Sequence, residues 1–374
     1  MIPFNRFGLS GNELAYVQEA LGRQTSGDGP FCRRAEALLE EIFGVPRVLV
    51  TTSCTHALEM SAILLEIGPG DEVIVPSFTF VSTVNAFVLR GATPVFADVR
   101  PDTLNLDERL LGALVTPKTK AIVPVHYAGV GCEMDEIGRV AAESGIAIVE
   151  DNAHGLLGSY RGRRLGTFGA LATQSFHETK NIACGEGGAL VVADARHAER
   201  AEILREKGTN RARFFRGQID KYTWVDVGSS YVLSDVLAAI LLGQLEARER
   251  IQARRRAIWE RYAEALRAWA PAAGVSLPLV PPHCEQAFHM FYLLLPDLAQ
   301  RTAFIAHLAS RGVAAVFHYQ PLHLSPMGVR FGGRAGACPV TESVSERLVR
   351  LPFHTTLSSE EQAKVIDAVT SFQA

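Results

Sequence analysis

The sequence predicts an α/β protein in which a large domain, built on a mixed and mostly parallel sheet, precedes a smaller C-terminal α+β domain. Short apolar runs alternate with segments of helical spacing over the first two thirds of the chain. The chain has 374 residues, 48% of them hydrophobic. That is long enough for two cores, because a domain usually takes roughly 100–200 residues.

Six short apolar runs are the predicted strands of the large sheet. They are residues 47–50, 72–75, 94–97, 121–125, 147–149 and 189–192. Runs this short and uniformly apolar are typical of parallel strands that helices cover on both faces. The segments 53–65 and 133–144 between them have helical spacing. Ligands bind outside the carboxyl ends of such strands, so the loops that follow them are the expected site.

One long helix is predicted to lead out of the large domain. Ser234 and Asp235 form a helix cap, and the chain then runs to about Trp269 with a single glycine, Gly243, where a bend is expected. Arginines and glutamates are interleaved along it, which favours a solvated face over a nucleic-acid surface. The arginines are Arg248, Arg250, Arg254, Arg255 and Arg256. We therefore expect a large domain over 1–245 and a small domain over 246–374.

Proline residues separate this helix from the final section of the chain. Pro278, Pro281 and Pro282 are followed by strand-like residues 291–295 and 313–318, with helical segments around them. This mixture predicts the small α+β domain.

Charge and composition exclude several classes of protein. Lys and Arg number 37 against 40 Asp and Glu, so the net charge of -3 provides no broad attraction for nucleic acid or an anionic membrane. Polar residues interrupt the longest uncharged stretch, 73–89, and residues 1–6 do not resemble a signal peptide. The six cysteines are scattered without metal-ligand or disulfide spacing. We expect a cytoplasmic protein with no metal, no nucleic acid and no membrane partner.

The first informative loop follows the run 147–149. Two carboxylates, Glu150 and Asp151, end the run, and His154 comes three residues later. Acidic residues at the carboxyl end of a strand face the ligand crevice. The alternative, that Asp151 caps the next helix, is left open.

The second informative loop contains Lys180 and the glycine-rich stretch 185–188. A lysine with a depressed pKa exposes a free amine, which can form a Schiff base with an aldehyde. The alternative is an exposed surface lysine beside a hairpin turn.

The third loop, residues 51–60, brings small hydroxyl residues to the start of a helix. Backbone N–H groups at a helix N-terminus bind phosphate well, and Ser53 as an ordinary N-cap is compatible with that function. A zinc site at Cys54 and His56 is excluded because no further ligands lie nearby in the sequence.

A phosphate cup, an acid and a lysine are the groups that an aldehyde-bearing, phosphorylated cofactor needs, and pyridoxal phosphate (PLP) fits that set. The order of these groups resembles that of the nucleotide-sugar aminotransferases, which are PLP enzymes of fold type I, the aspartate aminotransferase fold. The matching stretches are 53–58, 76–83, 150–154, 175–180, 185–188 and 318–323. The resemblance covers essentially the whole chain.

The resemblance implies roles for individual residues around the cofactor ring. Lys180 would bind PLP covalently and then move the proton during the reaction. Asp151 would pair with the pyridine nitrogen, His154 would lie near the ring hydroxyl, and Phe80 would stack on the ring. For Phe80 a place in the buried core is left open as the alternative. These four roles rest on matching positions in the family.

The resemblance also implies phosphate and substrate contacts. Cys54, Thr55 and Ser175 would meet the phosphate, as would Ser230 from the partner of a homodimer with shared active sites. Many relatives have Gly at the position of Cys54 and Asn at that of Ser230. Three residues of the small domain, His318, Tyr319 and His323, match a motif that lines the site, and structural roles for the two histidines are left open.

Four longer stretches resemble a subgroup that forms dTDP-4-amino-4,6-dideoxygalactose. They are residues 1–5, 123–129, 175–181 and 205–211 continuing through 222–224. The resemblance implies transfer of the amino group of L-glutamate to C4 of dTDP-4-dehydro-6-deoxyglucose. A 3-keto nucleotide sugar or a cyclitol ketone is an alternative substrate, and a non-catalytic PLP-fold regulator is an alternative of another class.

Overall fold

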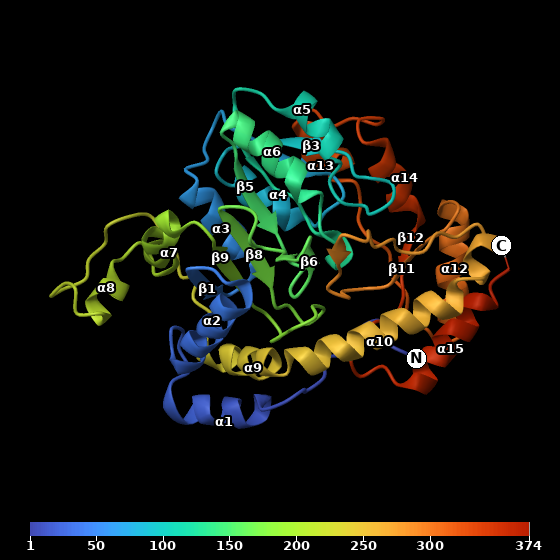
Figure 1. Ribbon diagram of the computed structural model, residues 1–374, viewed down its shortest axis with the longest axis horizontal. Helices are drawn as coiled ribbons and strands as arrows, with labels where there is room; N and C mark the ends of the chain where they lie inside the picture. The colour runs from blue at the N-terminus through green and yellow to red at the C-terminus, as the bar shows by residue number, and fades with distance from the viewer. Residues whose placement is uncertain (374) are drawn as a thin grey trace.

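The computed structural model describes residues 1–373 and has a seven-stranded sheet at its centre (Figure 1). Its strands, in spatial order, are β1 (Arg47–Thr51), β9 (Gly188–Val192), β8 (Leu171–Ser175), β5 (Ala147–Asp151), β4 (Thr119–Ile122), β2 (Glu72–Pro76) and β3 (Thr93–Ala97). Strand β9 is antiparallel to both of its neighbours, and the other pairs in this sheet are parallel. The predicted mixed, mostly parallel sheet is confirmed.

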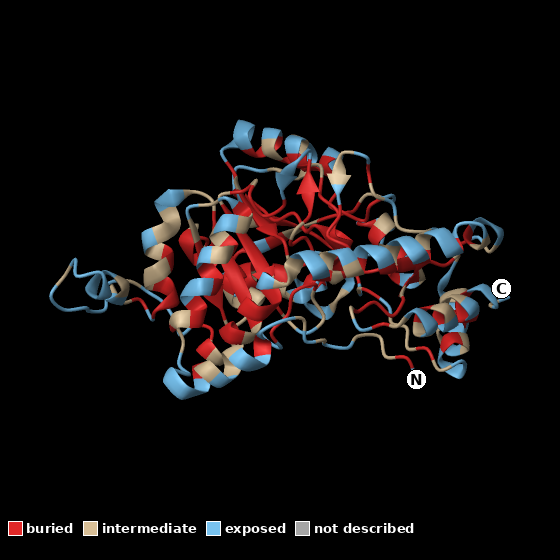
Figure 2. Cartoon of the chain, turned by 60° about the horizontal axis from the view of Figure 1, so that its bottom comes forward, coloured by how far each residue is buried: buried red, intermediate tan, exposed pale blue. Residues whose placement is uncertain are grey.

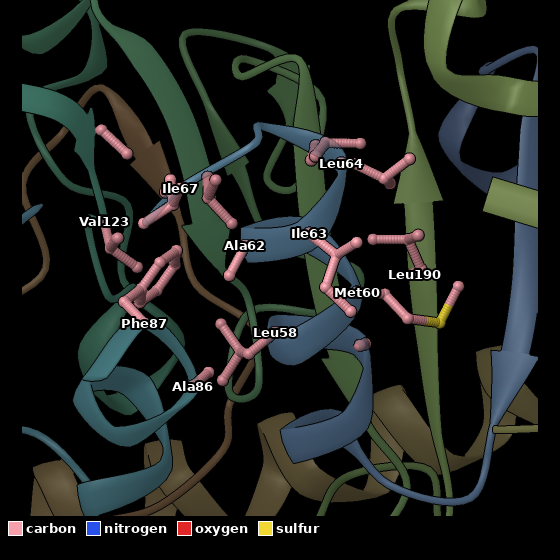
Figure 3. Close-up of a cluster of buried hydrophobic side chains, with 14 of the residues drawn as sticks. Leu58, Met60, Ala62, Ile63, Leu64, Ile67, Ala86, Phe87, Val123 and Leu190 are labelled. Carbon is pink, nitrogen blue, oxygen red and sulfur yellow. The ribbon is translucent and has the colours of Figure 1, made fainter. Parts of the chain in front are cut away.

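Helices cover both faces of this sheet because side chains alternate along each strand. Leu49 and Leu190 face one layer, whereas Val48 and Val191 face the other. The first layer contains α3 (Cys54–Leu64), α4 (Val81–Val88) and α7 (Ala198–Arg205), and the second contains α2 (Pro30–Phe43), α6 (Met134–Ser144) and α9 (Asp235–Glu246). Figure 3 shows how the apolar side chains of α3 fill the space between the sheet and α4.

All six predicted runs contribute to strands. One further strand of this sheet was not predicted, and one of the six was predicted too long. Strand β8 was not among the predicted runs because Thr173 and Gln174 make it look polar, although both are fully buried. Strand β4 ends at Ile122 rather than at residue 125. Pro124 has no N–H to donate, so the ladder is interrupted there and resumes only as an isolated bridge between Val125 and Asp151.

The helix that starts after Ser234 is broken at Ala247, not bent at Gly243 as expected. The Ser234 hydroxyl caps α9 by accepting from the Leu237 N–H, and α10 (Arg248–Leu266) continues towards the small domain (Figure 1). Gly243 lies inside α9, where a Cβ atom would come within 2.9 Å of the Glu13 nitrogen at the start of α1 (Glu13–Arg23). The missing side chain therefore lets α1 pack closely on α9.

A second hydrophobic core lies around the C-terminal part of the chain. It joins Ile258, Phe291, Phe304 and Val349, among others. Its elements are α11 (Trp269–Ala272), β11 (Tyr292–Leu294), α12 (Leu298–Ser310), β12 (Leu348–Arg350) and α15 (Ser359–Thr370), with α13 (Pro326–Arg330) and α14 (Pro339–Arg347) beside them. We keep the division near residue 245 as a proposal.

The expected strand at 313–318 is absent from the described structure. Val313 and Val316 make only isolated bridges, to Ile2 and Arg350, which is too short a ladder for a strand. The remaining short elements are α5 (Leu111–Leu114), β6 (Ser159–Tyr160), β7 (Arg163–Arg164), α8 (Arg211–Phe215) and β10 (Cys284–Glu285).

The arginines of α10 do not all lie on a solvated face. Figure 2 shows the outer surface of the helices exposed around a buried sheet. Arg254, however, donates to the carbonyls of Thr355 and Leu357, and Arg255 is buried with 3% exposure. The expectation of a solvated face is wrong for these two, because buried backbone carbonyls need donors and the arginines supply them. Within residues 1–373, none of the helices is both long and apolar enough to cross a bilayer.

Candidate active site

A cavity of about 580 Å³ lies where the sheet strands end and the small domain begins. It brings together nine of the predicted site residues, which are Cys54, Thr55, Phe80, Asp151, His154, Ser175, Lys180, His318 and Tyr319. They come from five separate segments of the chain, so the fold brings distant motifs together in one site.

Lys180 is presented to the cavity by a loop between β8 and β9. The Phe176 N–H donates to the Gly187 carbonyl at 2.8 Å and the Glu178 N–H to that of Gly185 at 2.9 Å, so the loop is closed at its base. Gly185 has a φ of 94°, which a residue with a side chain rarely adopts. Lys180 therefore belongs to a loop that is held by backbone hydrogen bonds and lines the cavity. The alternative, an exposed lysine on the protein surface, is wrong.

Burial lowers the pKa of Lys180 to about 8. The nearby Asp151 acts in the opposite direction, by favouring the charged ammonium, but desolvation dominates. The uncharged amine, which is the form that attacks an aldehyde, is therefore far more populated near neutral pH than in an ordinary lysine.

Asp151 ends β5 and points into the cavity floor with 5% exposure. Its Oδ2 accepts from the Thr83 hydroxyl at 2.7 Å, and its Oδ1 accepts from the Ala153 N–H at 3.2 Å. Thr83 is in turn bonded to the Thr79 hydroxyl at 2.8 Å. The element that follows Asp151 is strand β6 and not a helix, so the helix-cap alternative is wrong and the carboxylate can meet a ligand.

The N-terminus of α3 forms the second wall. Ser53 caps the helix by accepting from the His56 N–H at 3.1 Å, and the helix starts at Cys54. The Thr55 hydroxyl donates to Ser82 at 2.8 Å. Because the first N–H groups of a helix lack intrahelical partners, this wall suits a phosphate.

His154 has an unsatisfied nitrogen in this cavity. Its Nδ1 is buried without a hydrogen-bond partner among residues 1–373, and its ring stacks on His289 with centroids 4.1 Å apart. Burial, with a contribution from Lys180, holds the pKa of His154 well below the ordinary value. The ring is neutral, and its free nitrogen is available to a ligand.

Aromatic groups close the cavity on the side of the small domain. His318 stacks on Tyr319 at 3.8 Å, and its Nδ1 lies 3.1 Å from the Tyr127 hydroxyl. Burial keeps the pKa of His318 well below the ordinary value. Phe80 is 57% exposed, so its ring is open to stack on a ligand.

Two predicted residues lie outside the cavity. His323 is completely buried, with Nδ1 at 2.6 Å from the Ser77 hydroxyl and Nε2 at 3.0 Å from Glu342. Both ring nitrogens are therefore occupied, which is the structural alternative for this histidine. Ser230 is exposed and lines a different cavity, beside Lys207.

Arg350, Phe4 and His289 were not identified as site residues from the sequence. All three line the cavity. Arg350 comes from β12, and its guanidinium lies over the Phe4 ring at 4.6 Å. No motif surrounds Arg350 in the sequence. The signal for Phe4 was its place in the distinctive stretch 1–5.

The chemistry of this donor set fits PLP. Among the described residues, His154 Nδ1 has no hydrogen-bond partner, the Lys180 amine has a lowered pKa, and the N-terminus of α3 faces the cavity. Each of these groups has a counterpart on that cofactor. A cavity of this kind, at the carboxyl ends of a mostly parallel sheet, defines a PLP-dependent enzyme of fold type I.

Comparisons with known proteins identify the family. The model of the DegT/DnrJ/EryC1/StrS aminotransferase family matches residues 9–370. The chain belongs to this family, and it is therefore a PLP-dependent aminotransferase. The uncharacterized protein MJ1066 of Methanocaldococcus jannaschii is 34% identical over 98% of this chain and 96% of its own length.

Solved structures agree with that identification. The aminotransferase TlmJ from Streptoalloteichus hindustanus is 34% identical, with a TM-score of 0.91 over 99% of this chain and 98% of that one. Spr1654 from Streptococcus pneumoniae, solved in PLP and PMP forms, is 28% identical, with a TM-score of 0.92 over 99% and 98% of the two chains. The predicted fold class and the PLP cofactor are confirmed.

Proposed function

We propose that the chain transfers the amino group of L-glutamate to C4 of dTDP-4-dehydro-6-deoxyglucose and releases 2-oxoglutarate and dTDP-4-amino-4,6-dideoxygalactose. The observation that carries the amino transfer is the Lys180 amine, with its pKa near 8, in one cavity with Asp151. The choice of substrate rests on the resemblance of the distinctive stretches.

In this proposal Lys180, Asp151 and His154 each have a role at a particular atom of the cofactor or the substrate. Bound PLP supplies a sink for the electrons that a breaking C–H bond leaves behind. Lys180 anchors the cofactor and moves the proton at the glutamate α-carbon and at sugar C4, a task suited to a group whose pKa lies near the working pH. Asp151 holds the pyridine nitrogen protonated, and His154 donates or accepts at the ring hydroxyl.

The phosphate and ring contacts follow the same logic. Backbone N–H groups at Cys54 and Thr55, with the hydroxyls of Thr55 and Ser175, bind the phosphate. Phe80 stacks on the ring, and His318 and Tyr319 contact the sugar substrate.

Three of the distinctive stretches meet at the cavity, which supports the choice of substrate class. Phe4 lines the cavity, and the Asn5 amide donates to the Glu178 carbonyl at 3.0 Å, next to the lysine loop. Val125 is also a wall residue. Residues that distinguish the subgroup thus lie where a substrate would bind.

Arg350 is the best candidate to bind a carboxylate of the amino donor. Its guanidinium lines the cavity, its Nε is buried without a partner, and within residues 1–373 it makes no ion pair. A buried guanidinium is stabilised by a charged partner, and carboxylates match its geometry. Glutamate brings such a group beside Lys180.

We also propose a homodimer with shared active sites. The exposed position of Ser230 supports a contact with the partner subunit's cofactor phosphate, because its own cavity does not reach this residue.

The decisive experiment is an amination assay with glutamate and paired 4-keto and 3-keto dTDP-sugars, in which NMR gives the configuration of the product. We expect turnover of the 4-keto sugar and an axial amine at C4. Turnover of only the 3-keto sugar, or of a cyclitol ketone, would refute this substrate and favour the alternative.

The same preparation tests the non-catalytic alternative. The holoenzyme should be yellow, lose this colour when glutamate is added, and retain cofactor after borohydride reduction and denaturation. Lys180→Ala should retain none. A wild-type protein that stays yellow in the presence of glutamate would support a regulator rather than an enzyme.

A further inference from the structure

A strained turn at residues 287–289 lies directly behind the lysine loop. Phe288 has a φ of 50°, in the left-handed region that bulky residues avoid. The Ala287 N–H donates to the Gly129 carbonyl at 2.9 Å, so the start of the turn is tied to the large domain. Such a conformation persists only where surrounding contacts hold it.

Arg255 of α10 supplies the contacts that hold this turn. Its Nε donates to the Phe288 carbonyl at 2.9 Å, and its Nη2 donates to the His289 carbonyl at 2.5 Å. The residue is buried, and its guanidinium lies 4.8 Å from the Phe353 ring centre. Burial lowers the pKa of Arg255 to about 9, so it is still a cation at neutral pH and makes charge-assisted hydrogen bonds.

The turn is also bonded to the residue after Lys180. The Asn181 amide nitrogen donates to the Ala287 carbonyl at 2.6 Å, so its Oδ1 faces the Nδ1 of His289 at 2.7 Å. Because Oδ1 can only accept, Nδ1 of His289 must carry the proton. His289 is therefore in its Nδ1-protonated tautomer, and the pair fixes the backbone beside Lys180.

The face of the His289 ring packs against the ring of His154. The two imidazoles are nearly parallel, with an angle of 15° between their planes, and His154 has no hydrogen bond at Nδ1 to orient it. Stacking on His289 is thus its main constraint on that side. Burial holds the pKa of His289 well below the ordinary value. Smaller contributions in the same direction come from His154, Lys180, Arg255 and Arg350. Two neutral rings can stack without repulsion.

We propose that His289 is a positioning residue, held by Arg255, that sets both the ring of His154 and the loop of Lys180 for the cofactor. The evidence is the combination of its stacking contact with His154 and its hydrogen bond to Asn181. This inference rests on the proposed role of Lys180, but not on the identity of the keto sugar.

Two substitutions separate the two contacts of His289. His289→Phe keeps an aromatic ring for stacking and removes the hydrogen bond to Asn181. His289→Asn keeps a donor near the position of Nδ1 and removes the stacking. The matched control is His283→Asn on the same segment, because His283 is partly exposed and bonds to Glu133 outside the cavity.

The readouts are the PLP dissociation constant, the pH titration of the visible absorbance of the holoenzyme, and the rate of its colour loss with glutamate. Small displacements of reacting groups can slow a reaction up to about a hundredfold. We therefore expect the rate constant for colour loss with glutamate to fall roughly tenfold in each variant. The absorbance midpoint should shift, whereas the KM for glutamate should stay near that of the wild type. The control should match the wild type in all readouts.

Several outcomes decide the proposal. A fall in melting temperature with an unchanged absorbance midpoint and rate constant would mean that His289 is only structural. If both variants fail to fold, Arg255→Lys, which retains the charge but not the two-pronged geometry, must show the same shifts, and unchanged values there would overturn the proposal. Cofactor that remains reducible onto Lys180→Ala would instead refute the role of Lys180.

Discussion

Lys180 should capture PLP with a pH midpoint near 8. Burial lowers the pKa of its amine to about 8 from the ordinary 10.5, and only the neutral amine forms the bond to the aldehyde. The rate at which apoprotein binds PLP should therefore rise up to about pH 8 and level off above it, as stopped-flow absorbance will show. A rate that keeps rising towards pH 10.5 would contradict the depressed pKa. Lys180→Arg, which keeps a cation but has no nucleophilic amine, is the control.

Thr83 should strengthen cofactor binding through Asp151. Its hydroxyl donates to Oδ2 at 2.7 Å, and a hydrogen bond to a charged group is worth about 1.5–3 kcal/mol. Thr83→Val should therefore weaken PLP binding by roughly tenfold or more. Fluorescence titration of the apoprotein gives the dissociation constant.

Thr83→Ser is the matched control, because it keeps the hydroxyl. It should bind PLP nearly as the wild type does. Equal affinities for Thr83→Val and the wild type would show that Asp151 needs no help from Thr83.

Residues within one motif could be predicted from the sequence, whereas isolated ones could not. Asp151 ends a strand, Lys180 follows one, and both have recognisable neighbours, so the local pattern predicts their positions in the fold. Arg350 and His289 enter the cavity only through the packing of the small domain against the large one. His323 shows the converse, since it matches a family motif but is buried away from the cavity.

At the scale of elements, Gly188 controls how closely β9 approaches α3. A Cβ atom at this position would lie 2.3 Å from the Cys54 nitrogen and 2.3 Å from the Ser53 carbonyl carbon. Gly188→Ala should therefore displace the helix N-terminus and reduce PLP affinity more than it reduces the melting temperature. Isothermal titration with PLP and thermal unfolding measure the two effects.

The matched control lies in α6. A Cβ atom at Gly138 would meet nothing within 4 Å, so Gly138→Ala should stabilise the protein by up to about 1 kcal/mol and leave PLP affinity unchanged. If both variants bind PLP as the wild type does, the close approach of β9 to α3 has no function in the phosphate cup.

Helices and strands could be predicted where the local hydrophobic pattern agrees with the way the element packs in the fold. The apolar runs of β1, β2 and β9 read directly as strands. Strand β8 was hidden because Thr173 and Gln174 are buried polar residues, and the helix break at Ala247 has no glycine or proline to signal it. In each of these cases tertiary contacts outweigh local composition.

At the scale of the whole molecule, an arm over residues 211–228 projects from the large domain at α8 (Figure 1). It exposes several large apolar side chains, of which Trp224 is 76%, Phe215 63% and Tyr222 50% exposed. Exposed apolar groups gathered in this way mark an interaction site. A second copy of the chain is the occupant that the proposed shared active sites require.

Trp224→Ala should therefore weaken self-association. Interface tryptophans are commonly worth 2 kcal/mol or more, so the dimer dissociation constant should rise roughly thirtyfold. Sedimentation equilibrium measures it, and Leu298→Ala, at an exposed position on α12, is the control. Because Ser230 would reach the partner's phosphate, PLP affinity should fall together with dimerisation in Trp224→Ala. A wild-type protein that sediments as a monomer yet binds PLP tightly would contradict both the dimer and the shared site.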